Sequence, residues 1–165
     1  RLRPDILLLI AGEGPAVPDL KEKVKALGLR DHVQFIGYLD RSEELPACYA
    51  AADVFVFASR TETQGLVLLE AMAAGLPVVA LSEMGTTDIL APGRGALSPP
   101  ADVKAFGDAL ADFINRPSAW RHLFDEAPRY AEEWSDTAMA SRLAALYRSM
   151  AGVKIASAET LSATA

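Results

Sequence analysis

The sequence predicts an α/β fold, a parallel sheet flanked by helices and followed by a helical C-terminal segment. Short apolar runs alternate with amphipathic stretches at near-regular spacing, as βαβ units require. The first run, residues 6–11, is apolar throughout, which is typical of a strand buried on both faces. From residue 100 onward the composition favours helices, so the rest of the chain is expected to add helices to this sheet.

Spacing and capping signals place the elements that follow the first strand. Leu20, Val24 and Leu27 recur at i, i+4 and i+7, predicting an amphipathic helix that Gly28 ends. Ser42 is placed to cap the next helix. The expected elements are a helix over residues 17–29, a strand over 33–37, a helix over 42–52 and a β-branched, aromatic strand over 53–58.

The second half of the chain continues the alternation. Helix-forming residues that close on Gly75 predict a helix over residues 65–75 with a firm C-terminus. Further elements are expected as a strand over 77–81, a short helix over 86–90, an edge strand over 95–98, and helices over 101–115, 119–134 and 136–150. We expect one domain over residues 1–150 and a disordered tail over 151–165, which is rich in Ala, Ser and Thr.

The charge and cysteine content exclude several classes of function. The chain has 16 Lys and Arg against 22 Asp and Glu, a net charge of −6 at pH 7. Such an acidic chain lacks the basic surface that nucleic-acid binding needs, so no nucleic-acid partner is expected. The single cysteine, Cys48, excludes an internal disulfide framework and a zinc site built from several cysteines, and it indicates a reducing compartment.

The loops after the strands are the first places to look for a ligand, because open parallel sheets bind ligands beyond the carboxyl ends of their strands. Gly12 and Gly14 match the first two glycines of the dinucleotide fingerprint, but Val17 stands where the third is required. This substitution disfavours a nicotinamide cofactor. A tight turn, with Pro15 opening the next helix, is the alternative interpretation.

Two carboxylates mark the loop after the third strand and the helix that follows. Glu70 lies among apolar residues, so we expect it to be buried and to require a partner. Glu62 precedes it by eight residues. In the alternative interpretation, Glu62 is a solvated loop residue and Glu70 pairs with a local cation such as Arg60.

The start of the same helix predicts an anion site. The free N–H groups of Gly65, Leu66 and Val67 would bind an anion there, and glycine allows its close approach. Carboxylates accept hydrogen bonds from vicinal hydroxyls and amides donate to phosphate oxygens, so the combination suits a sugar nucleotide.

Glu62 and Glu70, with seven residues between them, resemble the E-x7-E signature of the retaining group 1 glycosyltransferases, family GT4. Residues 10–15, 33–38 and 49–56 also resemble the donor-binding half of that family, in family order. The resemblance covers residues 5–150. It implies the GT-B architecture, two Rossmann-like domains that face each other across a cleft, of which this chain is the C-terminal, nucleotide-sugar-binding domain.

The resemblance also implies roles for individual residues. Glu62 would be catalytic and contact hydroxyls of the transferred sugar, while Glu70 would hold the ribose hydroxyls. Further donor-binding residues would come from the helix start and the strand ends: Gln64, Gly65, Leu66, Val67, Tyr38, Leu39, Asp40, Gly12 and Gly14. The family more often has Phe at the position of Gln64.

The implied reaction is a metal-independent hexosyl transfer from a UDP- or GDP-sugar, without a cofactor and with retention of anomeric configuration. The implied partners are the donor and an N-terminal acceptor-binding domain of the same parent protein. We expect the chain to lack the family's first strand and helix, which carry an Arg and a Lys, and to be inactive alone. The resemblance implies a cytoplasmic protein and allows peripheral membrane association, at the inner face, through the missing half.

Two alternatives keep the fold but change the function. One is a non-catalytic Rossmann-like nucleotide-binding or interaction domain. The other is a GT-B sugar-nucleotide epimerase, which would need a catalytic His or further acids that the sequence does not offer. The two carboxylates, Glu62 and Glu70, favour the transferase.

Overall fold

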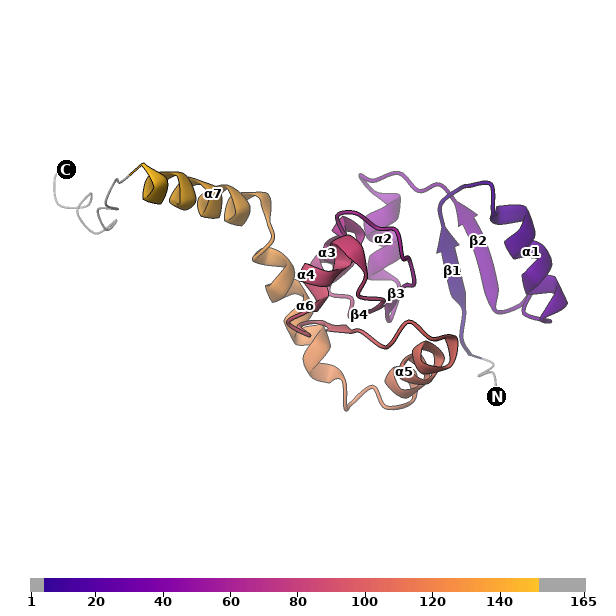
Figure 1. Ribbon diagram of the computed structural model, residues 1–165. Coiled ribbons are helices and arrows are strands. Elements are labelled where there is room, and N and C mark those ends of the chain that lie inside the picture. The colour runs from indigo at the N-terminus through magenta and orange to yellow at the C-terminus, as the bar shows by residue number, and fades with distance from the viewer. Residues whose placement is uncertain (1–4, 152–165) are drawn as a thin grey trace. The chain divides into compact units, whose positions relative to one another are not determined.

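The computed structural model describes residues 5–151, and the chain divides after Cys48 into two compact units (Figure 1). The strands form two parallel sheets, β1-β2 in the first unit and β3-β4-β5 in the second. The predicted α/β class with parallel strands is therefore confirmed. A single domain over residues 1–150 stays a prediction, and the predicted tail lies outside the described residues apart from Ala151.

The first unit is a βαβ unit. It contains β1 (Leu8–Ala11), α1 (Val17–Ala26) and β2 (Val33–Gly37), with Leu8 opposite Val33 in the parallel register. His32 anchors the start of β1, since its Nδ1 lies 3.0 Å from the carbonyl oxygen of Ile6 and its own carbonyl accepts from Leu8 N at 2.8 Å. His32 therefore has a structural role.

The burial predicted for β1 is wrong. Leu8 is 44% exposed and Leu9 is 39% exposed, although the strand is apolar throughout. The sheet that contains β1 has two strands, so this strand has fewer neighbours than a continuous apolar run normally indicates. The apolar composition correctly predicted that these residues form a strand. It could not predict how exposed the strand is, because exposure depends on which elements pack against it.

The second unit is built on a central strand. The helix α2 (Glu44–Ala50), which contains the division at Cys48, leads into β3 (Phe55–Phe57), α3 (Leu66–Ala73), β4 (Val78–Ala80) and β5 (Ala96–Leu97). The strand β4 lies between β3 and β5 and is fully buried. Leu68 and Met72 of α3 are also fully buried, so they form the core of this unit together with β4.

The rest of the second unit is helical, as predicted. The 3-10 helix η1 (Met84–Thr86) leads into α4 (Thr87–Leu90), and then come α5 (Val103–Asn115), α6 (Arg121–Glu132) and α7 (Asp136–Met150). The helix predicted over 101–115 begins two residues later, at Val103. The helix predicted over 119–134 is two residues shorter at each end. None of the described helices is long and apolar enough to cross a bilayer.

The helix α6 is held against α4 and the segment before β5 by polar and close contacts. The buried hydroxyl of Tyr130 donates to the carbonyl oxygen of Ile89 at 2.9 Å. Gly95 lies against α6, where a Cβ would come within 2.6 Å of the Ala127 Cα. Arg94 pairs with Glu126 at 2.8 Å and stacks over the Tyr130 ring. The same helix also packs against α3.

Candidate functional site

Glu62 is held by the backbone of its own loop. Its Oε1 accepts hydrogen bonds from Gln64 N and Gly65 N, both at 2.9 Å. These bonds, that of Gln64 first, lower the pKa of the Glu62 carboxyl below its ordinary value of 4.5, because they stabilise the charged form. The side chain is half-buried, ionised at neutral pH and fixed in orientation, and Oε2 takes no part in either bond.

The start of α3 is only partly available to a ligand. Gly65 is buried and adopts a left-handed conformation with φ 73°, and a Cβ there would lie 2.7 Å from the Cδ1 of Ile89. Its N–H donates to Glu62, so the prediction of a free amide at Gly65 is wrong. Leu66 and Val67 provide the next two amides, in the first turn of the helix.

The turn that contains Gly85 supports the Glu62 loop from behind. Gly85 N donates to the carbonyl oxygen of Glu62 at 2.9 Å, and a Cβ on Gly85 would overlap the carbonyl of Thr63. Thr86 is buried, and its Oγ1 lies 2.8 Å from the carbonyl oxygen of Leu81. For residues 82–88, which follow the predicted fourth strand, a strand-end site and a plain turn are equally compatible with the sequence. Gly85 is a signal of the close approach, since a glycine permits backbones to come this near.

Glu70 lies on an open face of α3. It borders a hollow of about 430 Å³ whose lining also includes Leu66 and Trp134. Leu66 is 52% exposed and Glu70 is half-buried, so the expectation that Glu70 is buried is wrong. A helix that is apolar on all sides still has a face directed away from the core. Glu70 does interact with a partner, as expected. Arg60, the cation named as a possible partner of Glu70 in the alternative interpretation, donates to the carbonyl oxygen of Ala101 at 2.9 Å.

The glycine turn after β1 meets the end of β2 in the first unit. Gly12, with φ 113°, donates its N–H to the carbonyl oxygen of Gly37 at 2.6 Å. Gly14 accepts from Val17 N at 3.2 Å, which makes a tight turn before α1. The helix begins at Val17 with Pro18 in its first turn, so the prediction that Pro15 opens it is wrong.

The segment after β2 is stabilised by its own side chains. Asp40 Oδ1 accepts from Ser42 N at 2.8 Å and from Glu43 N at 3.0 Å. The hydroxyl of Ser42 contributes most to lowering the pKa of the Asp40 carboxyl. Asp40 therefore caps this turn, and Ser42, which was predicted to cap the next helix, donates its hydroxyl to Asp40 instead.

Asp40 N donates to Glu44 at 2.9 Å, so this amide is occupied within the turn. Tyr38 is 69% exposed, and Leu39 is half-buried. The ring of Tyr38 is therefore open to a ligand, whereas the polar groups of Asp40 are engaged locally.

The structure brings the predicted residues together in two sets, one in each unit. Gly12, Gly14 and residues 38–40 gather at the carboxyl ends of β1 and β2, and residues 62–70 gather at the start of α3. Across residues 5–151 no three His, Cys, Asp or Glu side chains come close enough to hold a metal ion. The set at α3 offers backbone amides and carboxylates, which are groups for binding hydroxyls and phosphates, whereas the Gly12 amide and the polar groups of Asp40 in the other set are engaged locally.

The family model for glycosyl transferases group 1 matches residues 1–132 of the chain. The chain belongs to this family. The match contains every residue predicted for the site, whereas α7 lies beyond it. The family resemblance of the E-x7-E segment is thereby confirmed.

Other group 1 glycosyltransferases are similar over most of the chain. The alpha-D-kanosaminyltransferase of Streptomyces kanamyceticus is 33% identical over 146 residues, which are 87% of this chain and 38% of that protein. The GDP-mannose-dependent alpha-(1-6)-phosphatidylinositol monomannoside mannosyltransferase of Mycolicibacterium smegmatis is 38% identical over 122 residues, 69% of this chain and 32% of that protein.

The solved structure of Anabaena Alr3699/HepE in complex with UDP and glucose has the same fold. It has a TM-score of 0.76 at 23% identity and covers 89% of this chain and 41% of its own. This likeness confirms the predicted GT-B, Rossmann-like character of the domain. The chain spans well under half the length of these three proteins.

Proposed function

We propose that this chain is the donor-binding half of a retaining glycosyltransferase that uses a nucleoside-diphosphate sugar. The observation that carries the proposal is the pair of carboxylates on α3 and its leading loop. Glu62 is fixed by two backbone N–H groups at 2.9 Å, and Glu70 borders an open hollow eight residues later. This arrangement offers fixed acceptors for the hydroxyls of a sugar nucleotide, beside the amides of a helix start.

Glu62 is suited to contact the transferred sugar near its reacting carbon. Its Oε1 is occupied by the loop amides, which leaves Oε2 to accept from a sugar hydroxyl. The lowered pKa keeps the carboxylate charged, and a charged acceptor stabilises the positive charge that develops on the sugar ring in an oxocarbenium-like transition state.

The start of α3 is suited to the diphosphate. The amides of Leu66 and Val67 belong to the first turn, where N–H groups lack partners within the helix. The positive end of the helix dipole would stabilise the departing diphosphate at this point. We include no metal in this mechanism, because the amides and the dipole of the helix start supply positive charge at this point.

Glu70 is suited to the ribose. A carboxylate accepts from two vicinal hydroxyls at once, and the hollow beside Glu70 provides about 430 Å³ for the nucleoside. For Tyr38 and the Gly12 turn of the first unit, a role in binding the base stays a prediction from the family resemblance. GDP and UDP, the nucleotides named with the two similar proteins, are the candidates to test.

Calorimetric titration of UDP and GDP into the chain tests this site. Glu70→Ala should weaken nucleotide binding at least tenfold, about 1.4 kcal/mol, because a charged acceptor of two hydrogen bonds is lost. Asp125→Ala removes an exposed carboxylate on α6 and should leave the affinity unchanged. Equal affinities of wild type and Glu70→Ala would overturn the assignment.

The activity of the whole protein is part of the same proposal. We place the acceptor site in an N-terminal domain of the parent protein, and we expect the isolated chain to bind donor without transferring sugar. Sugar transfer by the isolated chain would contradict this division. Nucleotide binding without transfer by the complete protein would favour the non-catalytic alternative.

We also propose that the protein is cytoplasmic and associates with the inner face of the membrane through the other half. The single cysteine supports a reducing compartment. The name of the M. smegmatis relative includes a lipid, phosphatidylinositol monomannoside. Fractionation of cells that express the complete protein would test both statements, and recovery outside the cytoplasm and its membrane face would contradict them.

A further inference from the structure

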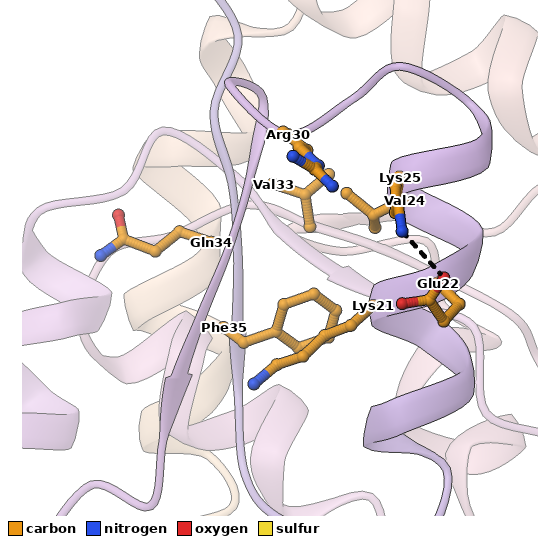
Figure 2. A pocket seen from close by; sticks show the side chains of 8 residues that line it. All are labelled: Lys21, Glu22, Val24, Lys25, Arg30, Val33, Gln34 and Phe35. Carbon is orange, nitrogen blue, oxygen red and sulfur yellow. Dashed lines mark ion pairs between the residues drawn. The ribbon is translucent and has the colours of Figure 1, made fainter.

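A second hollow lies in the first unit, between α1 and β2 (Figure 2). It has a volume of about 390 Å³. It is lined by Lys21, Glu22, Val24, Lys25, Arg30, Val33, Gln34 and Phe35. The hollow therefore combines three cationic side chains and one carboxylate with three apolar side chains and one amide.

The cations of this hollow are poorly neutralised. Lys21 Nζ lies 5.5 Å from the centre of the Phe35 ring. Lys25 pairs with Glu22 at 3.6 Å, but both side chains are more than half exposed, so solvent weakens this pair. Arg30 forms no ion pair with any residue between 5 and 151. A surplus of positive charge remains here in a chain whose net charge is −6.

The floor of the hollow is apolar. Val33 and Phe35 are alternate residues of β2 and therefore face the same side, toward Val24 of α1. All three side chains are half-buried. In Figure 2, Gln34 points away from this side, while Arg30 and Lys21 lie at the upper and lower edges of the apolar group.

This hollow is separate from the proposed donor residues of the same unit. Arg30 and Val33 lie at the amino end of β2, whereas Gly37 and Tyr38 lie at and beyond its carboxyl end. The strand has five residues, each adding about 3.3 Å. A ligand bound between Arg30 and Lys21 would not fill the donor site.

We propose that this hollow binds a phosphate monoester carried on an apolar body. The guanidinium of Arg30 has the fork geometry that binds two phosphate oxygens at once. Lys21 and Lys25 supply positive charge for the doubly charged group. The apolar floor of Val24, Val33 and Phe35 receives the body of the ligand and removes its surface from water.

Titration of the isotope-labelled chain with phenyl phosphate, followed by NMR, tests the proposal. The amide signals of Arg30 and Phe35 should shift saturably. Arg30→Gln should weaken binding about tenfold. Lys23→Gln makes the same charge change on α1, in the same unit as Arg30 but outside the lining, so it should weaken binding less than about twofold.

Equal weakening by Arg30→Gln and Lys23→Gln would show general charge attraction and would overturn the site. Failure of the shifts to saturate would also overturn it. Inorganic phosphate should bind more weakly than phenyl phosphate, and equal affinities would overturn the role of the apolar floor. The NMR spectrum of each variant reports on its folding in the same experiment.

Sedimentation with vesicles identifies the source of the phosphate. Binding to phosphatidylcholine vesicles that contain phosphatidic acid, lost in Arg30→Gln and absent without phosphatidic acid, would assign the site to a lipid headgroup. Saturable binding of phenyl phosphate without vesicle binding would assign it to a soluble phosphate monoester. Absence of both would overturn the proposal.

Discussion

Gly85 is the residue whose contacts most directly shape the Glu62 loop. A Cβ there would overlap the carbonyl of Thr63 and lie 2.6 Å from Gln64 N, both of them backbone groups that cannot rotate away. The loop and the turn must therefore separate if the glycine is replaced. The Glu62 carbonyl would then lose its bond from Gly85 N.

We expect Gly85→Ala to destabilise the protein by about 2 kcal/mol, in the range of overpacked sites. Gly107→Ala is the matched control, because a Cβ at Gly107 meets nothing within 4 Å and the residue lies inside α5. The control should stabilise by about 0.5–1 kcal/mol through the higher helix propensity of alanine. Urea unfolding measures both, and a Gly85→Ala chain as stable as wild type would contradict the contact.

The charge of Glu62 should show in the pH dependence of stability. A carboxyl whose pKa is lowered on folding stabilises the protein above its unfolded pKa, and this contribution is lost as pH falls through the folded pKa. For Glu62 the loss should begin as pH falls below about 4.5. Wild type should therefore be more stable than Glu62→Gln at neutral pH, and the difference should shrink in acid.

Urea midpoints of the two proteins between about pH 7 and pH 3 measure this difference. Glu22→Gln is the control, since the Glu22 side chain is exposed and pairs with Lys25 at the surface. Its midpoint should stay close to that of wild type at each pH. If the urea midpoints of wild type and Glu62→Gln differed by the same amount at every pH, the stabilisation from the backbone bonds of Glu62 would not depend on the charge of its carboxylate.

At the level of elements, α6 is tied to α4 through one buried hydroxyl. Tyr130 is 4% exposed, and its hydroxyl donates to the carbonyl oxygen of Ile89, 41 residues away in sequence. Removal of the hydroxyl leaves a buried carbonyl without this donor. The ring itself would keep its packing against Trp134 and Arg94.

Tyr130→Phe should therefore cost about 1–2 kcal/mol of stability. Tyr147→Phe, on the exposed face of α7, removes the same atom from a residue that is 62% exposed. Its effect should stay within about 0.5 kcal/mol. Thermal unfolding of the two variants compares them, and equal midpoints would contradict a stabilising role for the buried bond.

The helix α3 shows how far composition predicts the environment of an element. Its residues are apolar apart from Glu70, which suggested burial on every side. Leu68, Ala71 and Met72 are indeed buried, but Leu66 is exposed and Glu70 is half-buried. Periodicity could not reveal this face, because apolar residues occupy both sides of the helix.

At the scale of the whole molecule, the two units differ in how much core they have. The strand β4 is fully buried between two neighbours, whereas β1 pairs only with β2 in a two-stranded sheet and is largely exposed. Small sheets with few buried residues are marginally stable. The first unit should therefore open more often than the second.

Hydrogen exchange should reveal this difference between the units. Amides of β1 and β2 should exchange at least about tenfold faster than those of Val79 and Ala80 in β4, after correction for intrinsic rates. The measurement uses the intact chain and compares amides within one sample. Equal protection in β1 and β4 would show that the two units open in a single cooperative step.

The order of strands and helices, their parallel class, and the spacing of Glu62 and Glu70 could be predicted from the sequence. These features follow from periodicity, caps and motifs, which are local properties of the chain. The exposure of β1, the bond of Glu62 to the Gly65 amide and the support of the loop by Gly85 became known from the three-dimensional structure. The contact of Gly85 with the loop and the surroundings of β1 depend on segments that lie apart in sequence, and no local pattern encodes which segments meet. The bond from Gly65 to Glu62 spans three residues, and it depends on the conformation that the loop adopts in the fold.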